Sequence, residues 1–233
     1  MAAVKGIRLP VLAGATAVLM GLAVGLVFFY APTDADQGFS QRIFYIHVPV
    51  ALTSYVFFGV GAFYAGRYLL RRDPQDDIRS YVGIHVGIVF GTLVLITGPI
   101  WAHISWGVWW DWSDEQLNVF LVLFLFYAAY FMLRYSLDPG PRRAAFSAAY
   151  ALLGVGLIPL SILAVHIATS LIHPTVFTTD GPQMDRPMFV TFLVAWAGVV
   201  ALGALLYQTE VLGKRLDARL RLVRRELAGE IPL

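Results

Sequence analysis

The segment Trp106–Ser113 holds four of the six tryptophans of this chain, and Asp114 and Glu115 follow it directly. Indole rings gathered so densely can hold a large, flat and apolar ligand. Burial contributes about 25 cal/mol per Å², and stacking adds about 0.5–1.5 kcal/mol per ring pair. Tryptophan also forms the aromatic belts of membrane proteins, but a belt needs only a ring or two at each helix end. We therefore interpret this stretch, called the Trp segment below, as a platform for an apolar ligand.

Two backbone geometries would make such a platform. In a short helix lying in the membrane interface, Trp106, Trp109 and Trp110 share one arc of about 100°, with Asp111 on the opposite side. In an extended segment, Trp110 and Trp112 share a face against Asp111. Either geometry gives an aromatic surface with its charges in water, and both are open at this point.

The five histidines are the other residues that could do chemistry. His47 and His173 lie in polar segments on either side of the Trp segment, His103 precedes it closely, and His85 and His166 lie in apolar runs. An ionisable side chain at membrane depth is costly and is a functional candidate for that reason, although a single histidine at a helix end is often only solvated or hydrogen-bonded. Two neutral imidazoles on opposite sides of a flat ligand make the axial ligation of bis-histidine haem. His47 and His173 are the candidates for such a pair.

Six apolar stretches must position these residues. Each is long enough to cross the roughly 30 Å hydrocarbon layer, which takes about 20 residues. Charged residues make up only 14% of the chain, against about 25% in soluble domains. We place the spans near residues 8–30, 48–70, 81–104, 117–136, 146–168 and 188–208. The prediction is a single all-α integral membrane unit of six transmembrane helices, because helices satisfy their own backbone polar groups in lipid.

The distribution of charge sets the expected orientation. Fifteen of the 17 lysines and arginines fall on the N-terminal side, in alternate loops and in the C-terminal tail. The other side holds Arg42, Arg186 and seven acidic residues. By the positive-inside rule both termini are cytoplasmic and the Trp segment faces the periplasm. The first span, which Lys5 and Arg8 precede, is expected to be a retained helix rather than a signal peptide. His85 then lies near the inner face, where it is structural or part of a second, inner haem position.

The polar segments differ between the two sides. The inner loops 71–80 and 137–145 are short basic connectors, whereas the outer loops 31–47, 105–116 and 169–187 carry aromatic, acidic, proline and histidine residues. Functional residues concentrate in loops held by a rigid scaffold, so we expect the chemistry in the outer loops.

The C-terminal tail, residues 209–233, is basic and amphipathic. We expect a helix lying on the anionic inner leaflet, with a docking site for a cytoplasmic partner as the alternative and no role in nucleic-acid binding. The chain contains no cysteine. Thiolate metal ligands, disulfides and a thiol relay are therefore excluded.

Around the Trp segment the chain resembles the haem-handling membrane proteins that carry a tryptophan-rich WWD motif. The family signature is Trp-Gly-x-x-Trp-x-Trp-Asp between histidines of the outer loops. The chain matches it in order at Trp106, Gly107, Trp110 and Trp112. The run Arg42–Pro49 and the Leu-x-His at 171–173 resemble the flanking histidine contexts. Six helices, a short chain and cytoplasmic termini narrow the resemblance to the cytochrome c maturation protein C family, also called haem exporter protein C, over residues 10–208.

One position departs from the family pattern. Ser113 follows Trp112 where the family has its closing aspartate; with one inserted residue, Asp114 takes that place and Leu117 aligns with a family leucine. The arginine usually found two residues after the aspartate is then Gln116. The charged contacts of this loop, to haem or to a partner, therefore differ from the family pattern.

The resemblance implies a function in haem delivery. Haem b would be held transiently at the outer face, with His47 and His173 as axial ligands of the iron. It would then pass to a membrane-anchored periplasmic haem chaperone, for delivery to apocytochrome c. The chain would catalyse no turnover of its own. An ABC transporter pair and a small single-helix subunit would be its partners in the cytoplasmic membrane.

The expected haem contacts extend beyond the two histidines. They are Trp106, Gly107, Trp109, Trp110, Trp112 and Asp114. Arg42, one of the two outer basic residues, is our own candidate for a haem propionate, because arginine matches carboxylate geometry. Two alternatives are open. A permease that carries haem through the bundle would need ligating residues at mid-membrane depth, such as His85 and His166. A structural subunit of an unrelated membrane complex would use the Trp segment only to dock a partner.

Overall fold

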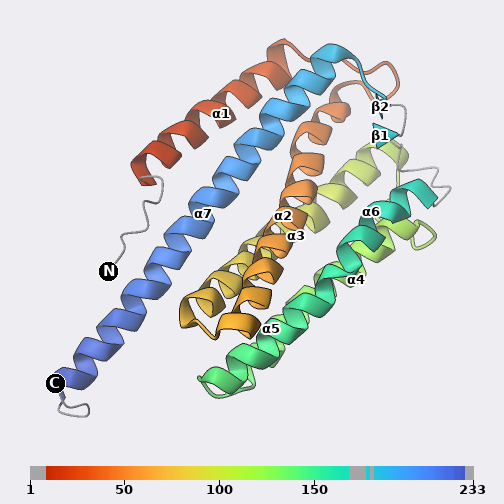
Figure 1. The fold of residues 1–233 in the computed structure, drawn as a ribbon. Coiled ribbons are helices and arrows are strands. Elements are labelled where there is room, and N and C mark those ends of the chain that lie inside the picture. Colours follow the sequence, from red (N-terminus) through yellow and green to blue (C-terminus); the bar gives the residue numbers. More distant parts are fainter. Residues whose placement is uncertain (1–8, 168–176, 179–180, 229–233) are drawn as a thin grey trace.

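The computed structural model describes residues 9–167, 177–178 and 181–228, which form a bundle of long helices with one short hairpin (Figure 1). The helices are α1 (Leu9–Phe29), η1 (Phe39–Ile43, a 3-10 turn), α2 (Phe44–Arg71), α3 (Pro74–Trp106), α4 (Glu115–Tyr135), α5 (Pro141–Val155), α6 (Leu157–Ile167) and α7 (Arg186–Leu227). Strands β1 (Phe177–Thr178) and β2 (Gly181–Pro182) pair antiparallel. His173, Lys5 and Arg8 lie outside the described residues, as does the side chain of His166.

Six helical runs among the described residues are long and apolar enough to cross a membrane, which confirms the predicted fold class. The third run begins earlier than expected, at Pro74 rather than near residue 81. Asp73 caps it by accepting a hydrogen bond of 2.9 Å from the backbone N–H of Gln75. Pro74 at the first helical position and the acidic Asp76 and Asp77 in the first turn also favour a helix start. Most of the predicted inner loop, from Pro74 onward, is therefore helical.

The last two spans also differ from expectation. The fifth is built from α5 and α6, which are separated at Gly156. The sixth does not end near residue 208, because α7 runs for 42 residues without a break. At 1.5 Å per residue it is roughly 63 Å long, about twice the hydrocarbon thickness. A tail helix lying on the leaflet would need a bend near residue 209, and the structure shows a continuous helix that projects beyond the bundle instead (Figure 1).

The centre of the bundle is the antiparallel pair α2 and α3 (Figure 1). Glycines allow their backbones to meet: a Cβ on Gly83 would lie 2.6 Å from the backbone nitrogen of Gly61. Small residues at such crossings let membrane helices pack closely. Helices α1 and α7 pack together, with α7 also against α2 and α3, and α4 packs against α5 and α6.

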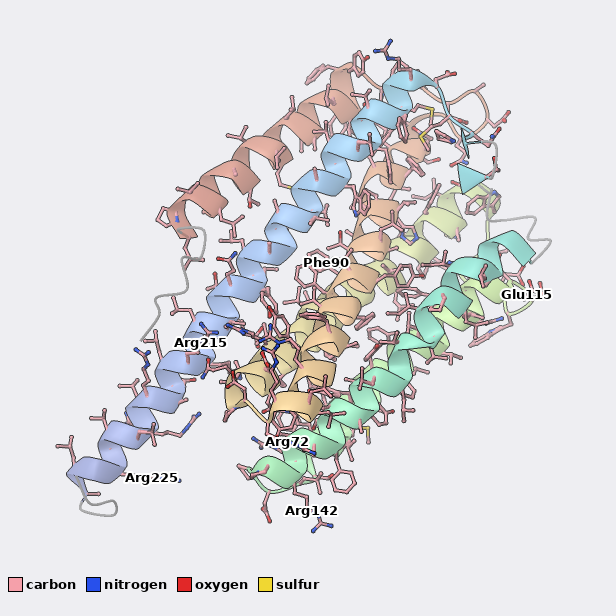
Figure 2. All side chains as sticks on the ribbon, in the orientation of Figure 1. Arg72, Phe90, Glu115, Arg142, Arg215 and Arg225 are labelled. Atoms are coloured by element: carbon pink, nitrogen blue, oxygen red, sulfur yellow. The ribbon has the colours of Figure 1, made fainter. Side chains whose placement is uncertain are left out.

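The bundle has two ends of different character. One end carries η1, the Trp segment and the β-hairpin, and we call it the tryptophan end (Figure 1). At the other end lie the α2–α3 and α4–α5 connections and the C-terminal part of α7, and we call it the basic end. Figure 2 shows Arg72, Arg142, Arg215 and Arg225 toward the basic end and Glu115 at the opposite one.

Candidate functional site

The end of α3 determines how the Trp segment begins. The helix continues through Trp106 and stops at Gly107, whose φ of 77° is a left-handed conformation that glycine adopts readily. The backbone N–H of Gly107 closes the helix by donating to the carbonyl of His103 at 3.0 Å. From there to Asp114 the chain forms bends and a turn. Both predicted backbone geometries, the interfacial helix and the extended segment, are therefore wrong for the part after Trp106.

The start of α4 fixes the other end of the segment. Asp114 is 3% exposed and caps α4, with its carboxylate accepting from the backbone N–H of Leu117 at 3.0 Å. The side-chain amide of Asn118 donates to the carbonyl of Trp112 at 2.7 Å. Because the Asp114 carboxylate is buried in the helix cap, it serves the loop's shape and is not part of its exposed surface.

Ser113, the residue that departs from the family pattern, supports the exposed acid of the loop. Its backbone N–H and its hydroxyl both donate to the Asp111 carboxylate, at 2.8 and 2.6 Å. The hydroxyl and then the backbone bond stabilise the charged form, so they hold the pKa of Asp111 below its usual value. The acidic side of the Trp segment is therefore Asp111, kept ionised at the surface.

The tryptophans form three ring contacts. Trp109 stacks on His103 with ring centroids 4.1 Å apart and planes 5° from parallel. Trp110 leans against Trp112 at 5.7 Å, and Trp106 leans against Trp101 of α3, also at 5.7 Å. Trp109 and Trp112 remain 59% and 73% exposed, which is unusual for indoles. These two rings give the tryptophan end an apolar surface open to a ligand.

His47 lies in the first turns of α2 and is only 9% exposed. Its Nδ1 is 2.8 Å from the hydroxyl oxygen of Thr97. That hydroxyl donates its single proton to the carbonyl of Leu93, also at 2.8 Å. The Thr97 oxygen must then accept from His47, which assigns the imidazole proton to Nδ1 and the lone pair to Nε2. In that tautomer a metal would bind through Nε2.

Two neighbours shape the space around this imidazole. Gly98 leaves room for the ring, since a Cβ there would lie 3.1 Å from Cε1 of His47. Trp101 meets the ring edge-on with centroids 5.7 Å apart. Trp101 in turn donates from its indole N–H to the side-chain oxygen of Gln37 at 3.0 Å, which ties the loop between α1 and α2 to α3.

The structure joins some of the predicted site residues and separates others. Trp101 links His47 to Trp106 and hence to the Trp segment. Arg42 faces elsewhere: its guanidinium donates to the carbonyl of Val27 near the end of α1 and lies over the rings of Phe28 and Phe39. His85 belongs to the basic half, where its Nδ1 is 2.7 Å from the carboxylate of Glu210.

Sequence reasoning missed three residues of this site, namely Thr97, Trp101 and Gln37. Thr97 and Trp101 stand in an apolar span among residues that only fill the core, and nothing in their spacing sets them apart. Gln37 lies in a loop that the sequence already marks as a functional candidate, but its partner could not be identified without the fold.

Known proteins resemble this chain along most of its length. The model of the family described as Heme exporter protein C matches residues 1–225. The Heme exporter protein C of Bradyrhizobium diazoefficiens is 32% identical over 215 residues, which are 91% of this chain and 81% of that protein. The protein of the same name from Paracoccus denitrificans is 31% identical over 224 residues, or 93% and 91% of the two chains. A ccmC-like mitochondrial protein of cytochrome c biosynthesis from Arabidopsis thaliana is 29% identical over 202 residues, or 86% and 75%.

Proposed function

The chain belongs to the haem exporter protein C family and is a multi-pass membrane protein; on that premise we propose that it binds haem b transiently at its tryptophan end and presents it for the maturation of c-type cytochromes. The observation that carries the proposal is the state of His47. Its hydrogen bond to Thr97 favours the tautomer with the proton on Nδ1, the form in which an imidazole binds a metal through Nε2.

The residues of the tryptophan end fit haem in two further respects. The exposed rings of Trp109 and Trp112 offer the apolar contact that a porphyrin needs. The indole N–H of Trp110 is buried without a hydrogen-bond acceptor in the described part of the chain. A carboxylate such as a haem propionate would satisfy it, and an unsatisfied buried donor costs about 1–3 kcal/mol.

Each residue then has a separate task. Bound haem supplies an iron that takes nitrogen ligands above and below its plane. His47 offers one nitrogen, and we propose His173 for the other. Thr97 and Trp101 hold the His47 ring in place, and Trp109 and Trp112 exclude water from the macrocycle. Gly107 ends α3 and Asp114 caps α4, so both shape the loop, and Arg42 packs against the end of α1.

We place the tryptophan end at the periplasmic face. The support is the concentration of lysines and arginines at the opposite end, which the positive-inside rule assigns to the cytoplasm. From that face haem would pass to a membrane-anchored periplasmic haem chaperone. The other proposed partners are an ABC transporter pair and a small single-helix subunit, with the bilayer around all of them.

Haem transfer in a defined system tests this function. The purified chain in proteoliposomes should take up haem and pass it to an added apo-chaperone on the side that the Trp segment faces. Transfer should fail with His47→Ala and with His173→Ala and persist with His85→Ala. Haem movement between the two leaflets by the chain alone would instead support a permease. A wild-type chain that binds no supplied haem would contradict the proposal.

A further inference from the structure

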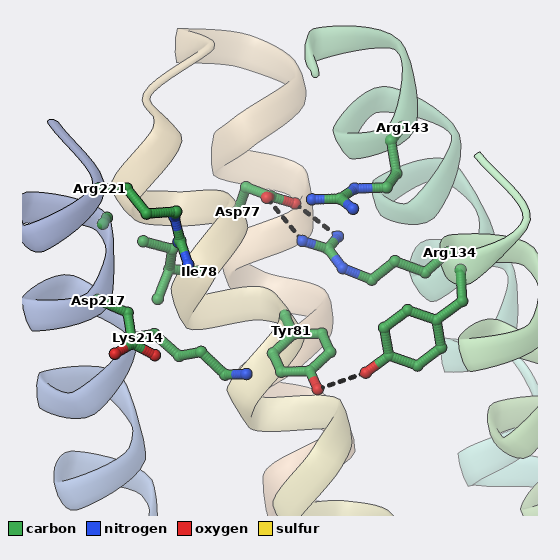
Figure 3. Close-up of a pocket in the computed structure, with 10 residues that line it drawn as sticks. Asp77, Ile78, Tyr81, Arg134, Arg143, Lys214, Asp217 and Arg221 are labelled. Atoms are coloured by element: carbon green, nitrogen blue, oxygen red, sulfur yellow. Dashed lines mark hydrogen bonds and ion pairs between the residues drawn. The ribbon is translucent and has the colours of Figure 1, made fainter. Parts of the chain in front are cut away.

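A cavity of about 230 Å³ lies at the basic end, between α3, α4, α5 and α7 (Figure 3). Four basic side chains line it, and they come from three helices. They are Arg134, Arg143, Lys214 and Arg221. Two acids, Asp77 and Asp217, also line the cavity, as do Tyr81 and Tyr135. The cavity is therefore a meeting point of cations contributed by elements far apart in the sequence.

One side of the cavity is formed by the ion pair between Arg134 and Asp77. The two terminal guanidinium nitrogens of Arg134, Nη1 and Nη2, donate to the carboxylate of Asp77, each at 2.8 Å (Figure 3). The Arg134 side chain is 8% exposed, and its guanidinium carbon lies 5.0 Å from the centre of the Tyr81 ring. Asp77 is thus neutralised by Arg134 and has little charge left for the other cations.

The three remaining cations exceed the one remaining acid. Among the described residues, no carboxylate oxygen lies within 4.0 Å of a side-chain nitrogen of Arg143, Lys214 or Arg221. The contrast with nearby Arg67 and Arg79 is clear, since both pair with the buried Asp76, at 3.2 and 3.3 Å. The ammonium of Lys214 lies over the Tyr81 ring instead, 4.9 Å from its centre. Among the described residues, the cavity therefore presents a surplus of positive charge, since its three unpaired cations exceed the single remaining acid, Asp217.

The position of the cavity indicates what could supply the compensating anion. Tyr81 lies two turns into α3, Tyr135 is the last residue of α4, and their hydroxyls hydrogen-bond at 2.8 Å. Tyrosines at this level mark the membrane interface, where lipid phosphates lie. Ile78 adds an apolar wall, so the site combines cations with apolar surface. An amphiphile with a phosphate headgroup matches both the cations and the apolar wall of the cavity.

We propose that this cavity binds the phosphate of an anionic phospholipid headgroup, held by Arg143, Lys214 and Arg221. Basic pockets between transmembrane helices on the cytoplasmic side are suited to such headgroups. The bound phosphate would join Arg143 of α5 to Lys214 and Arg221 of α7, because both helices line the cavity. The lipid would thus anchor the long α7 helix to the bundle.

Lipid binding to the full-length chain in neutral detergent tests this site. Native mass spectrometry would compare phosphatidylglycerol with phosphatidylcholine, and inorganic phosphate would be the free-anion arm. The wild type should prefer phosphatidylglycerol, and the Arg143→Gln/Lys214→Gln/Arg221→Gln variant should lose at least about tenfold in affinity for it. The control Arg142→Gln/Arg219→Gln/Arg225→Gln removes the same charge from exposed positions outside the cavity and should lose less than about threefold.

Three results would overturn the assignment. Equal losses in the two triple variants would show that charge alone attracts the lipid. Equal binding of the two lipids by the wild type would exclude an anionic site. Inorganic phosphate that displaces the lipid at comparable concentration would assign the cavity to a free anion. If the cavity variant does not fold, Asp217→Asn provides a second test. It removes the competing acid and should raise the affinity for phosphatidylglycerol. An unchanged affinity would count against the site.

Discussion

Different kinds of contact stabilise the two ends of the bundle. At the basic end, Asp76 accepts from Arg67 and Arg79, and Asp77 accepts two bonds from Arg134. All ion pairs between described residues lie in that half of the molecule. At the tryptophan end the contacts are between aromatic rings, supported by single hydrogen bonds such as those of Thr97 and Gln37.

This difference separates stability from ligand binding. Buried ion pairs must be complete, because removing one partner leaves an uncompensated charge in a medium of low dielectric constant. Exposed indoles contribute little to the folded state, but they gain much when a flat apolar ligand covers them. We therefore expect substitutions at the basic end to change folding, and substitutions at the tryptophan end to change haem affinity.

The largest effect is expected from breaking the Asp77–Arg134 pair. Asp77→Ala leaves the nearly buried guanidinium of Arg134 without its carboxylate, which should lower the free energy of unfolding by about 3–5 kcal/mol. Denaturant unfolding in detergent micelles would measure the change. The exposed Asp217→Ala is the matched control and should stay close to wild type. If Asp77→Ala lowered the free energy of unfolding by less than about 1 kcal/mol, the ion pair would not stabilise the basic end as we expect.

At the tryptophan end, the double substitution Trp109→Ala/Trp112→Ala is expected to have the largest effect. Losing roughly 100 Å² of apolar contact with the porphyrin should weaken haem binding by about 2.5 kcal/mol, or about 60-fold in Kd. Unfolding should be little changed, because both rings are exposed. Haem titration followed by absorbance measures the affinity. The control is Phe63→Ala, which removes an exposed ring of α2. An equal loss of haem affinity in this control would show that Trp109 and Trp112 do not form the haem platform.

A smaller effect is expected from the positioning of His47. Thr97→Val keeps the side-chain volume but removes the hydroxyl that accepts from Nδ1. Loss of such a supporting hydrogen bond should weaken haem binding about tenfold, and Thr97→Ser should restore it. Nitrogen-detected NMR of the imidazole would show the Nδ1-protonated tautomer in wild type and a mixture in Thr97→Val. An unchanged tautomer together with unchanged affinity would exclude this role for Thr97.

The smallest effect concerns the acidic side of the Trp segment. The folded-state pKa of Asp111 lies below its usual value because Ser113 donates two hydrogen bonds to it. The resulting stabilisation is present above the unfolded-state pKa and disappears as the pH falls through the folded-state pKa. Ser113→Ala removes the hydroxyl, so the pKa of Asp111 should rise and the loss of stability in acid should become smaller. Carboxyl-carbon NMR titration measures the pKa, and an unaltered value would show that the hydroxyl contributes nothing.

The same contrast between the ends explains what the sequence could predict. The six spans follow from the lengths of the apolar runs, the Trp segment from its density of indoles, and the candidate His47 from the cost of an ionisable residue beside a span. The early start of α3 was missed because Asp73, Asp76 and Asp77 look like loop residues until their capping and pairing are known. The continuation of α7 was missed because a basic amphipathic helix suits the membrane surface as well as a projecting helix.

Within the site, the sequence could not predict the orientation of the side chains or their partners. The guanidinium of Arg42 donates to the carbonyl of Val27 near the end of α1, and its pairing with a haem propionate stays a prediction. The Asp114 carboxylate caps α4, and its contact with haem also stays a prediction. Thr97 and Trp101 act through contacts with His47 that join α2 to α3 at this end. Such contacts depend on helix rotation, which hydropathy does not fix.

The electronic state of bound haem tests the central claim most directly, because it reports the ligation by His47 itself. Electron paramagnetic resonance of the ferric complex should show low-spin haem in wild type and in the control His85→Gly. His47→Gly should convert it to a high-spin form, and added imidazole should restore the low-spin signal by replacing the missing ring. A His47→Gly complex that remains low-spin without imidazole, with wild-type haem affinity, would contradict the account.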